Sequence, residues 1–150
     1  MTNPLHIPAR TDAPIACDMS TAEDTADERL AAYRRLFEHA LMRRDRDESA
    51  VAFVFRADQG VLETVEHLAH REAACCPFLE YRVETAGHEV TYMLTNPITG
   101  DERDSVDAML DVFYALPDHA GSDMGDLLAR MAERGVDVEK TEPERFVLRR

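Results

Sequence analysis

Basic residues are scarce in this chain relative to acidic ones, and long apolar segments are missing. Lys and Arg number 17 against 30 Asp and Glu, which gives a formal net charge of -13. Because nucleic acids and anionic membrane surfaces are polyanions, this charge predicts that the chain by itself binds no nucleic acid and no membrane. A membrane span needs about 20 apolar residues, and the first 14 residues lack the apolar core of a secretory signal. We therefore expect a cytoplasmic protein.

Cysteine is also sparse, with 3 residues: Cys17, Cys75 and Cys76. An odd number, with two of them adjacent, argues against a disulfide scaffold. In a reducing compartment we expect all three to remain thiols. The sequence further lacks a phosphate-binding glycine loop, a dinucleotide fingerprint, a Ser-His-Asp elbow and a Cys-x-x-Cys pair. No nucleotide cofactor is therefore expected, and any catalysis would use side chains or a bound metal.

Hydrophobic periodicity predicts one small α+β domain. A chain of 150 residues, 45% of them hydrophobic, can bury a single core. In the C-terminal region, a short helix through 127–131 and a last strand at 146–148 are predicted. The predicted elements before it are a strand at 14–19, a helix at 25–42, a strand at 50–55, a helix at 61–76, strands at 81–85 and 90–95, and a helix at 105–116. This βαβαββα order predicts a sandwich in which the helices pack on one face of a mainly antiparallel sheet.

The chain divides into three predicted parts. Residues 1–13 are read as a flexible N-terminus, 14–118 as the α+β domain with the thiol cluster, and 119–150 as a C-terminal extension. Within the domain, the helix at 25–42 has an apolar stripe that includes Tyr33 and Phe37, with Arg29 expected on the outer face. The basic residues at 43–46 are expected to end that helix.

Glu72 lies in the apolar stripe of the helix at 61–76. At about 100° per residue, the following residues fall within about 60° of it on a helical wheel: Val61, Val65, Leu68, Ala69, Cys75 and Cys76. A carboxylate placed there must be paired, metal-bound or protonated, because desolvating an isolated charge is costly. Cys75 and Cys76 follow at i+3 and i+4. All three side chains can therefore converge on one point.

Thiolates and a carboxylate in one cluster are suited to soft metals. Zinc, copper(I), mercury(II) and arsenic(III) favour thiolate ligands, and Glu72 can add a harder ligand or carry a proton. Cys17 precedes a helix N-terminus, which favours the thiolate form, and can complete the set if the fold brings it near. Alternatively, the cysteines are core filler and Glu72 is paired to an arginine such as Arg82.

Two histidines and two aromatics near the cluster are assigned other roles. His67 and His70 fall about 140° to 160° from Glu72 on the wheel, so they are not expected to share its site. Phe78 and Tyr81 are expected to pack over the cluster as core residues, with the Tyr81 hydroxyl within possible reach of Glu72.

The string from Arg71 to Phe78, REAACCPF, has Ile15-Ala16-Cys17 upstream and a hairpin ending Thr95-Asn96-Pro97 downstream. It resembles a group of small bacterial proteins, and segments appended to MerR-type heavy-metal regulators, built around Glu-x-x-Cys-Cys-x-Phe. The resemblance covers about residues 14–115. It implies metal or metalloid handling, with Cys17, Cys75 and Cys76 as thiol ligands and Glu72 as their carboxylate partner. The winged helix-turn-helix of the regulators is absent, so DNA binding is not implied.

Three functional hypotheses follow. The first is soft-metal or metalloid binding by Cys17, Cys75, Cys76 and Glu72, in detoxification, in sensing or as a metal-dependent active site. The second is an enzyme in which Glu72, Cys75 and Cys76 act on a small-molecule substrate, for example by organomercurial-type bond cleavage. The third is a non-catalytic interaction module. An exposed sheet edge also makes a homodimer possible.

Overall fold

The computed structural model describes residues 4–10, 12–119, 123–141 and 145–149. Its helices are α1 (Ala26–Ala40), α2 (Val61–Cys75), α3 (Arg103–Ala115), the 3-10 helix η1 (Leu116–Asp118) and α4 (Met124–Glu133). Its strands are β1 (Leu5–Ile7), β2 (Ala16–Asp18), β3 (Leu41–Asp47), β4 (Ala50–Arg56), β5 (Glu80–Ala86), β6 (Glu89–Thr95), β7 (Asp137–Thr141) and β8 (Arg145–Arg149). The predicted α+β class is confirmed. In the described part of the chain, no helix has the length and apolarity that crossing a membrane demands.

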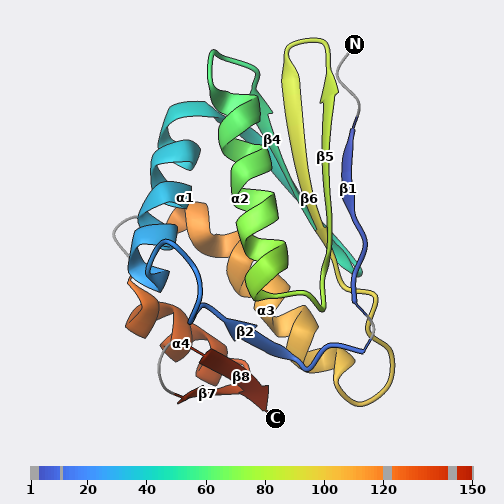
Figure 1. The fold of residues 1–150 in the computed structure, drawn as a ribbon, viewed down its shortest axis with the longest axis vertical. Helices are drawn as coiled ribbons and strands as arrows, with labels where there is room; N and C mark the ends of the chain where they lie inside the picture. The colour runs from blue at the N-terminus through green and yellow to red at the C-terminus, as the bar shows by residue number, and fades with distance from the viewer. Residues whose placement is uncertain (1–3, 11, 120–122, 142–144, 150) are drawn as a thin grey trace.

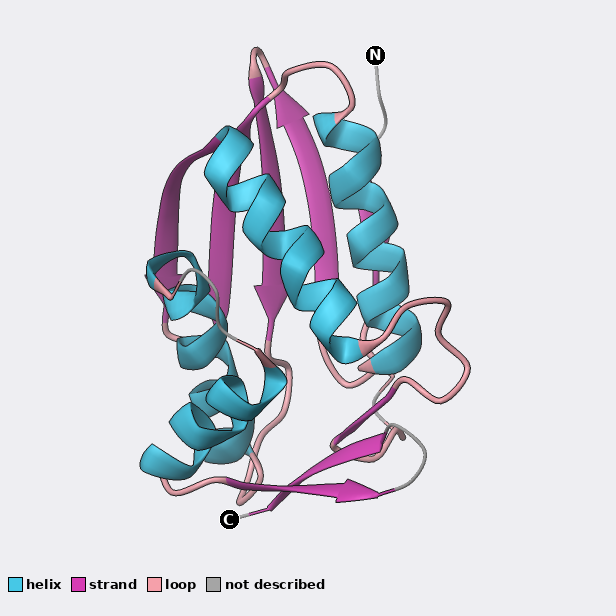
Figure 2. Cartoon of the chain, turned by 90° about the vertical axis from the view of Figure 1, so that its left-hand side faces the viewer, coloured by secondary structure: helices cyan, strands magenta, loops and turns pink. Residues whose placement is uncertain are grey.

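The larger sheet carries the main core. Its strand order is β1-β5-β6-β4-β3, and every neighbouring pair is antiparallel. Helices α1 and α2 lie side by side over one face of it (Figures 1 and 2). Alternate residues of the central strands are buried beneath these helices; they include Val51, Phe53 and Phe55 in β4 and Val90, Tyr92 and Leu94 in β6. This alternation is why the chain forms strands here and why the helices cover only one face.

The smaller sheet has the order β2-β8-β7 and lies at the lower end of the molecule in Figure 1. Strand β8 pairs antiparallel with β2, so Phe146 stands opposite Cys17. A hydrogen bond joins helix α4 to α1: the Met124 backbone N–H donates to Asp27 Oδ1 at 2.8 Å. The described residues after 119, which the sequence suggested as an extension, therefore pack against the first half of the chain.

Three strands, β1, β3 and β7, were not predicted. β1 lies within the segment expected to be flexible, and its Leu5 pairs with Val83 of β5. β3 occupies the basic segment that was expected to end the first helix, which instead gives way directly to a strand at Leu41. β3 is an edge strand with alternating charges, Arg43-Arg44-Asp45-Arg46-Asp47. Charged side chains protect such an edge from pairing with another strand. Because most residues of β3 are charged, the sequence shows no apolar alternation here that would predict a strand.

Candidate functional site

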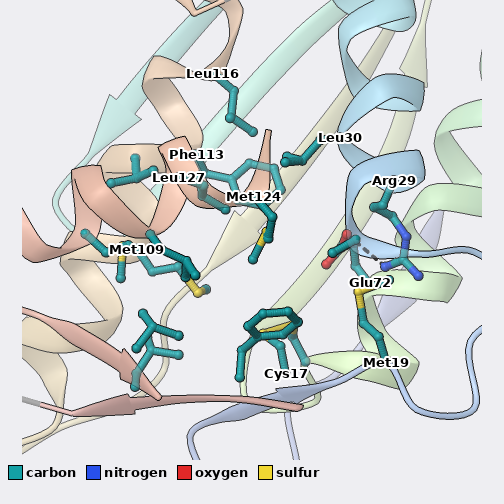
Figure 3. Close-up of a pocket in the computed structure, with 18 of the residues that line it drawn as sticks. Cys17, Met19, Arg29, Leu30, Glu72, Met109, Phe113, Leu116, Met124 and Leu127 are labelled. Atoms are coloured by element: carbon teal, nitrogen blue, oxygen red, sulfur yellow. Dashed lines mark hydrogen bonds and ion pairs between the residues drawn. A yellow bond between two sulfur atoms is a disulfide. The ribbon is translucent and has the colours of Figure 1, made fainter. Parts of the chain in front are cut away.

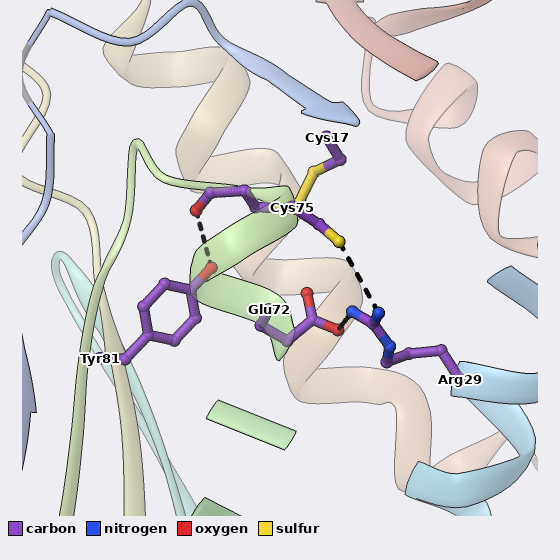
Figure 4. Close-up of a disulfide and its surroundings, with 6 residues drawn as sticks. Cys17, Arg29, Glu72, Cys75 and Tyr81 are labelled. Carbon is purple, nitrogen blue, oxygen red and sulfur yellow. Dashed lines mark hydrogen bonds and ion pairs between the residues drawn. A yellow bond between two sulfur atoms is a disulfide. The ribbon is translucent and has the colours of Figure 1, made fainter. Parts of the chain in front are cut away.

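A disulfide between Cys17 and Cys76 joins β2 to the C-terminus of α2 (Figure 4). The two residues are 59 positions apart in the sequence, and their Cα atoms are 4.4 Å apart. The expectation that all three cysteines are thiols is therefore wrong for this structure. Its physical reason is the pairing of β2 with β8, which fixes the Cys17 strand beside the end of α2. Cys75 is free and buried.

Helix α2 buries the predicted stripe. Glu72 is 8% exposed, Cys75 4% and Cys76 6%, and the apolar residues predicted to share their face are buried as well. His67 and His70 are exposed on the opposite face, as the wheel predicted. Pro77 follows the last helical bond, in which the Cys76 N–H donates to the Glu72 carbonyl. The Tyr81 hydroxyl donates to the Cys76 carbonyl at 2.9 Å and not to Glu72.

Arg29 is the partner of Glu72, and the expectation that Arg29 lies on the outer face of its helix is wrong. It is only 4% exposed, and its Nη1 donates to Glu72 Oε1 at 3.0 Å. The suggested alternative, Arg82, pairs instead with Glu80 at 3.0 Å. A signal was present in the sequence, because Arg29 lies one turn before Tyr33 and about 40° from it on a helical wheel.

The Arg29 guanidinium holds three groups together. It donates twice to Asp24, from Nε at 2.7 Å and from Nη2 at 2.8 Å, in a two-pronged contact. Its Nη2 also lies 3.7 Å from the Cys75 sulfur (Figure 4). Arg71 also contacts Asp24, with Nη1 at 3.1 Å from Oδ2, the oxygen that accepts from Arg29 Nε. Two arginines and two carboxyl groups therefore form a mostly buried network.

Burial and this network shift the ionisation of the cluster. Burial raises the pKa of Glu72, and the nearby Arg29 charge opposes the shift. Burial also raises the pKa of Cys75 against a hydrogen bond from Arg29, so this thiol is protonated at neutral pH. For Arg29, burial alone would lower the pKa, but hydrogen bonds to Asp24 and the charge of Glu72 outweigh it and raise the pKa. Arg29 is therefore always charged.

An apolar cavity of about 110 Å³ adjoins the disulfide. Cys17, Cys76, Glu72 and Arg29 form part of its wall. The rest is almost entirely apolar and includes four methionines, Met19, Met109, Met124 and Met131, together with leucine, valine and phenylalanine side chains from α3, α4 and the smaller sheet. Figure 3 shows Glu72 and Arg29 across the cavity from Met109 and Leu127. The C-terminal segment thus supplies much of the wall, a contribution that the sequence patterns did not indicate.

The predicted site residues lie close together, but only three of the four line the cavity. Cys17, Cys76 and Glu72 line the cavity, whereas Cys75 is not among its lining residues and contacts Arg29. Among the residues that the structure describes, no group of three or more His, Cys, Asp and Glu side chains is arranged to hold a metal ion. Arg29 places a positive charge against both Glu72 and Cys75, which opposes a cation bound between them. Cys17 and Cys76 are the two cysteines that line the cavity.

Comparison of the chain with protein-family models, curated proteins and solved structures found no match. Its function is therefore inferred from the chemistry of the site.

Proposed function

We propose that the protein binds a soft metal or metalloid ion through Cys17 and Cys76 in their reduced state. The observation that carries this proposal is the meeting of two sulfurs, 59 residues apart in the sequence, on the wall of a cavity. We place the protein in the cytoplasm, where low-molecular-weight thiols would keep the pair reduced. The ion is then cargo, in detoxification or sensing, and the resemblance to the Glu-x-x-Cys-Cys-x-Phe proteins, which implies metal or metalloid handling, supports this role.

Charge favours two thiolates over the four-ligand set expected from the sequence. A divalent soft ion bound by two thiolates is neutral, so it can be buried without the cost of an uncompensated charge. Adding Glu72 or Cys75 as a ligand would break contacts with Arg29 and leave that guanidinium with fewer acceptors. In this proposal Glu72 therefore accepts a hydrogen bond from Arg29 and transfers protons, and it is not a ligand. Cys75 is not a ligand either, because it accepts a hydrogen bond from Arg29.

The test is a titration of the fully reduced protein with Hg²⁺ in the presence of excess monothiol, so that only a chelating pair competes. The wild type and the Cys75→Ser variant should bind one ion with similar affinity. Cys17→Ser and Cys76→Ser should lose this binding, because one thiol of the pair is gone and the Cys75 sulfur, which contacts Arg29 and lies outside the cavity lining, does not replace it. Binding that survives in either of those two variants, or its absence from the wild type, refutes the proposal.

A second candidate is an enzyme that cleaves a carbon–mercury bond, and the position of Glu72 favours it. This carboxyl lines the same cavity as the two sulfurs, and burial favours its protonated form. In such a reaction the carbon–mercury bond breaks, its electron pair takes the Glu72 proton, and mercury stays on the two thiolates. Glu72→Gln should then keep mercury binding but lose hydrocarbon release. Equal release by the variant and the wild type excludes this role.

A further inference from the structure

We infer that the preferred ligand of the Cys17 and Cys76 pair is trivalent arsenic carrying one organic group, with that group held in the apolar cavity. This inference rests on the proposed function and narrows it to a substrate class. Two features carry it: the number of cysteine sulfurs in the cavity wall, and the apolar character of most of the rest of that wall.

Two sulfurs match the valence of a monosubstituted arsenical. Trivalent arsenic forms three bonds; with one bond to carbon, two remain for thiolates. Inorganic arsenic(III) needs a third thiolate to complete the same set. Cys75 is the only other cysteine, and its sulfur lies against Arg29 and outside the cavity wall. Two cysteines line the cavity and the third does not, and this arrangement favours an arsenical with one organic group over inorganic arsenic(III).

The cavity fits the remaining substituent. Its volume of about 110 Å³ is somewhat smaller than the roughly 150 Å³ of an apolar cavity that holds benzene in another protein. Methionine side chains are flexible and polarisable, so the four in this wall can adjust to a methyl group or a small ring. Glu72 and Arg29 close the polar end of the cavity near the sulfurs, where an arsenic-bound oxygen leaves as water.

The exchange balances without an oxidant. Two cellular thiols first reduce the Cys17–Cys76 disulfide and are themselves oxidised to one disulfide. The two protein thiols then replace the two hydroxyl groups of the arsenical. Two arsenic–sulfur bonds form, two arsenic–oxygen bonds break, and the thiol protons leave with the hydroxyls as two waters. The arsenic–carbon bond is unchanged.

The experiment measures the binding of phenylarsine oxide and of arsenite to the reduced protein by calorimetry, in the presence of excess monothiol. Phenylarsine oxide should bind more tightly than arsenite in the wild type and in Cys75→Ser. Ala26→Leu fills part of the cavity, since Ala26 lines it. It should weaken phenylarsine oxide binding roughly tenfold and leave arsenite binding unchanged. Ala31→Leu, on the same helix and outside the cavity lining, is the matched control.

The outcomes separate this inference from the proposed function. If Hg²⁺ chelation depends on Cys17 and Cys76 but phenylarsine oxide binds no better than arsenite, the inference fails and the proposed function stands. An equal effect of Ala26→Leu and Ala31→Leu on phenylarsine oxide also overturns it, as does loss of binding in Cys75→Ser. If neither Hg²⁺ nor phenylarsine oxide depends on the pair, both fail together.

Discussion

The two ends of the molecule are stabilised differently. At the end formed by the larger sheet, aromatic rings fill the space beneath α1: Phe53 packs against Phe37 with ring centroids 5.0 Å apart and against Phe113 at 6.2 Å. At the end formed by the smaller sheet, flexible methionines surround a cavity, and a disulfide and a buried ion-pair network hold the elements together. Figure 2 shows the smaller sheet below the tips of α1 and α2.

This difference separates folding from function. Close packing of rigid side chains stabilises one structure and leaves no room for a ligand. The end formed by the smaller sheet is packed less closely, and it contains the cavity and the reactive groups. The functional residues sit at the junction, since α1 and α2 run from the close-packed core to the cavity and bring Arg29, Glu72 and Cys76 with them.

The largest difference should come from truncating one residue in each region. Phe53→Ala should lower the free energy of unfolding by about 4 kcal/mol, because Phe53 is fully buried and surrounded by aromatic rings. Met109→Ala, in the cavity wall, should cost about half as much, since the site is already partly open. Urea unfolding monitored by circular dichroism measures both. Equal losses would show that the two regions are packed alike.

Opening the disulfide should weaken one region selectively. In the chain-entropy model, a bridge across 59 residues stabilises the folded state by about 4 kcal/mol. Cys76→Ser should lose stability of that order relative to the oxidised wild type, whereas Cys75→Ser should lose much less. Hydrogen exchange should show amides of β2 and β8 losing protection while those of β4 and β6 keep theirs. A uniform loss along the chain would contradict the regional picture.

Removing the buried cation should be nearly as severe. Arg29→Met leaves Asp24 and Glu72 without their main partner and should cost about 3 kcal/mol. Arg82→Met, which breaks an exposed pair with Glu80, is the control and should cost at most about 1 kcal/mol. Thermal unfolding of the two variants at neutral pH gives the comparison. Matching melting temperatures would mean that Arg29 contributes no more than a surface ion pair.

The smallest effect concerns pH. Because burial raises the pKa of Glu72 above its ordinary value of 4.5, the folded state keeps this proton at pH values where the unfolded state has lost it. Stability from this group is therefore greatest below pH 4.5 and falls as the pH rises through the raised pKa. Asp24 acts in the opposite sense below its ordinary value of 3.8, outside this range.

Comparing wild type with Glu72→Gln isolates the contribution. The difference in unfolding free energy between them should change with pH above 4.5, with the wild type losing ground as the pH rises. A constant difference would show that folding does not shift the pKa of Glu72, and a difference that moves in favour of the wild type would show that Arg29 outweighs burial and lowers it.

The sequence predicted what depends on local periodicity. The α2 wheel correctly placed Glu72 with Cys75 inside and His67 with His70 outside, because a helix repeats every few residues and its buried face is visible as a stripe. Thr25 and Glu28 have the spacing of a capping box, and both reciprocal bonds are present at the start of α1.

What depends on distant pairing could not be read from such patterns. Cys17 lies beside Cys76 because β2 pairs with β8, which comes more than a hundred residues later in the chain. The sequence of β8 does not indicate which strand it pairs with. The cavity is likewise assembled from α1, α3, α4 and the smaller sheet. Arg29 was misplaced for another reason: a charged residue was assumed to face water, although its wheel position put it beside Tyr33.

The central claim is that Cys17 and Cys76 act as a facing dithiol while Cys75 stays with Arg29. X-ray absorption at the arsenic edge of the reduced protein loaded with phenylarsine oxide tests it most directly, because it counts the atoms bonded to arsenic. We predict two sulfur neighbours and one carbon in both the wild type and Cys75→Ser. A third sulfur in the wild type that disappears in Cys75→Ser, or fewer than two sulfurs, would contradict the account.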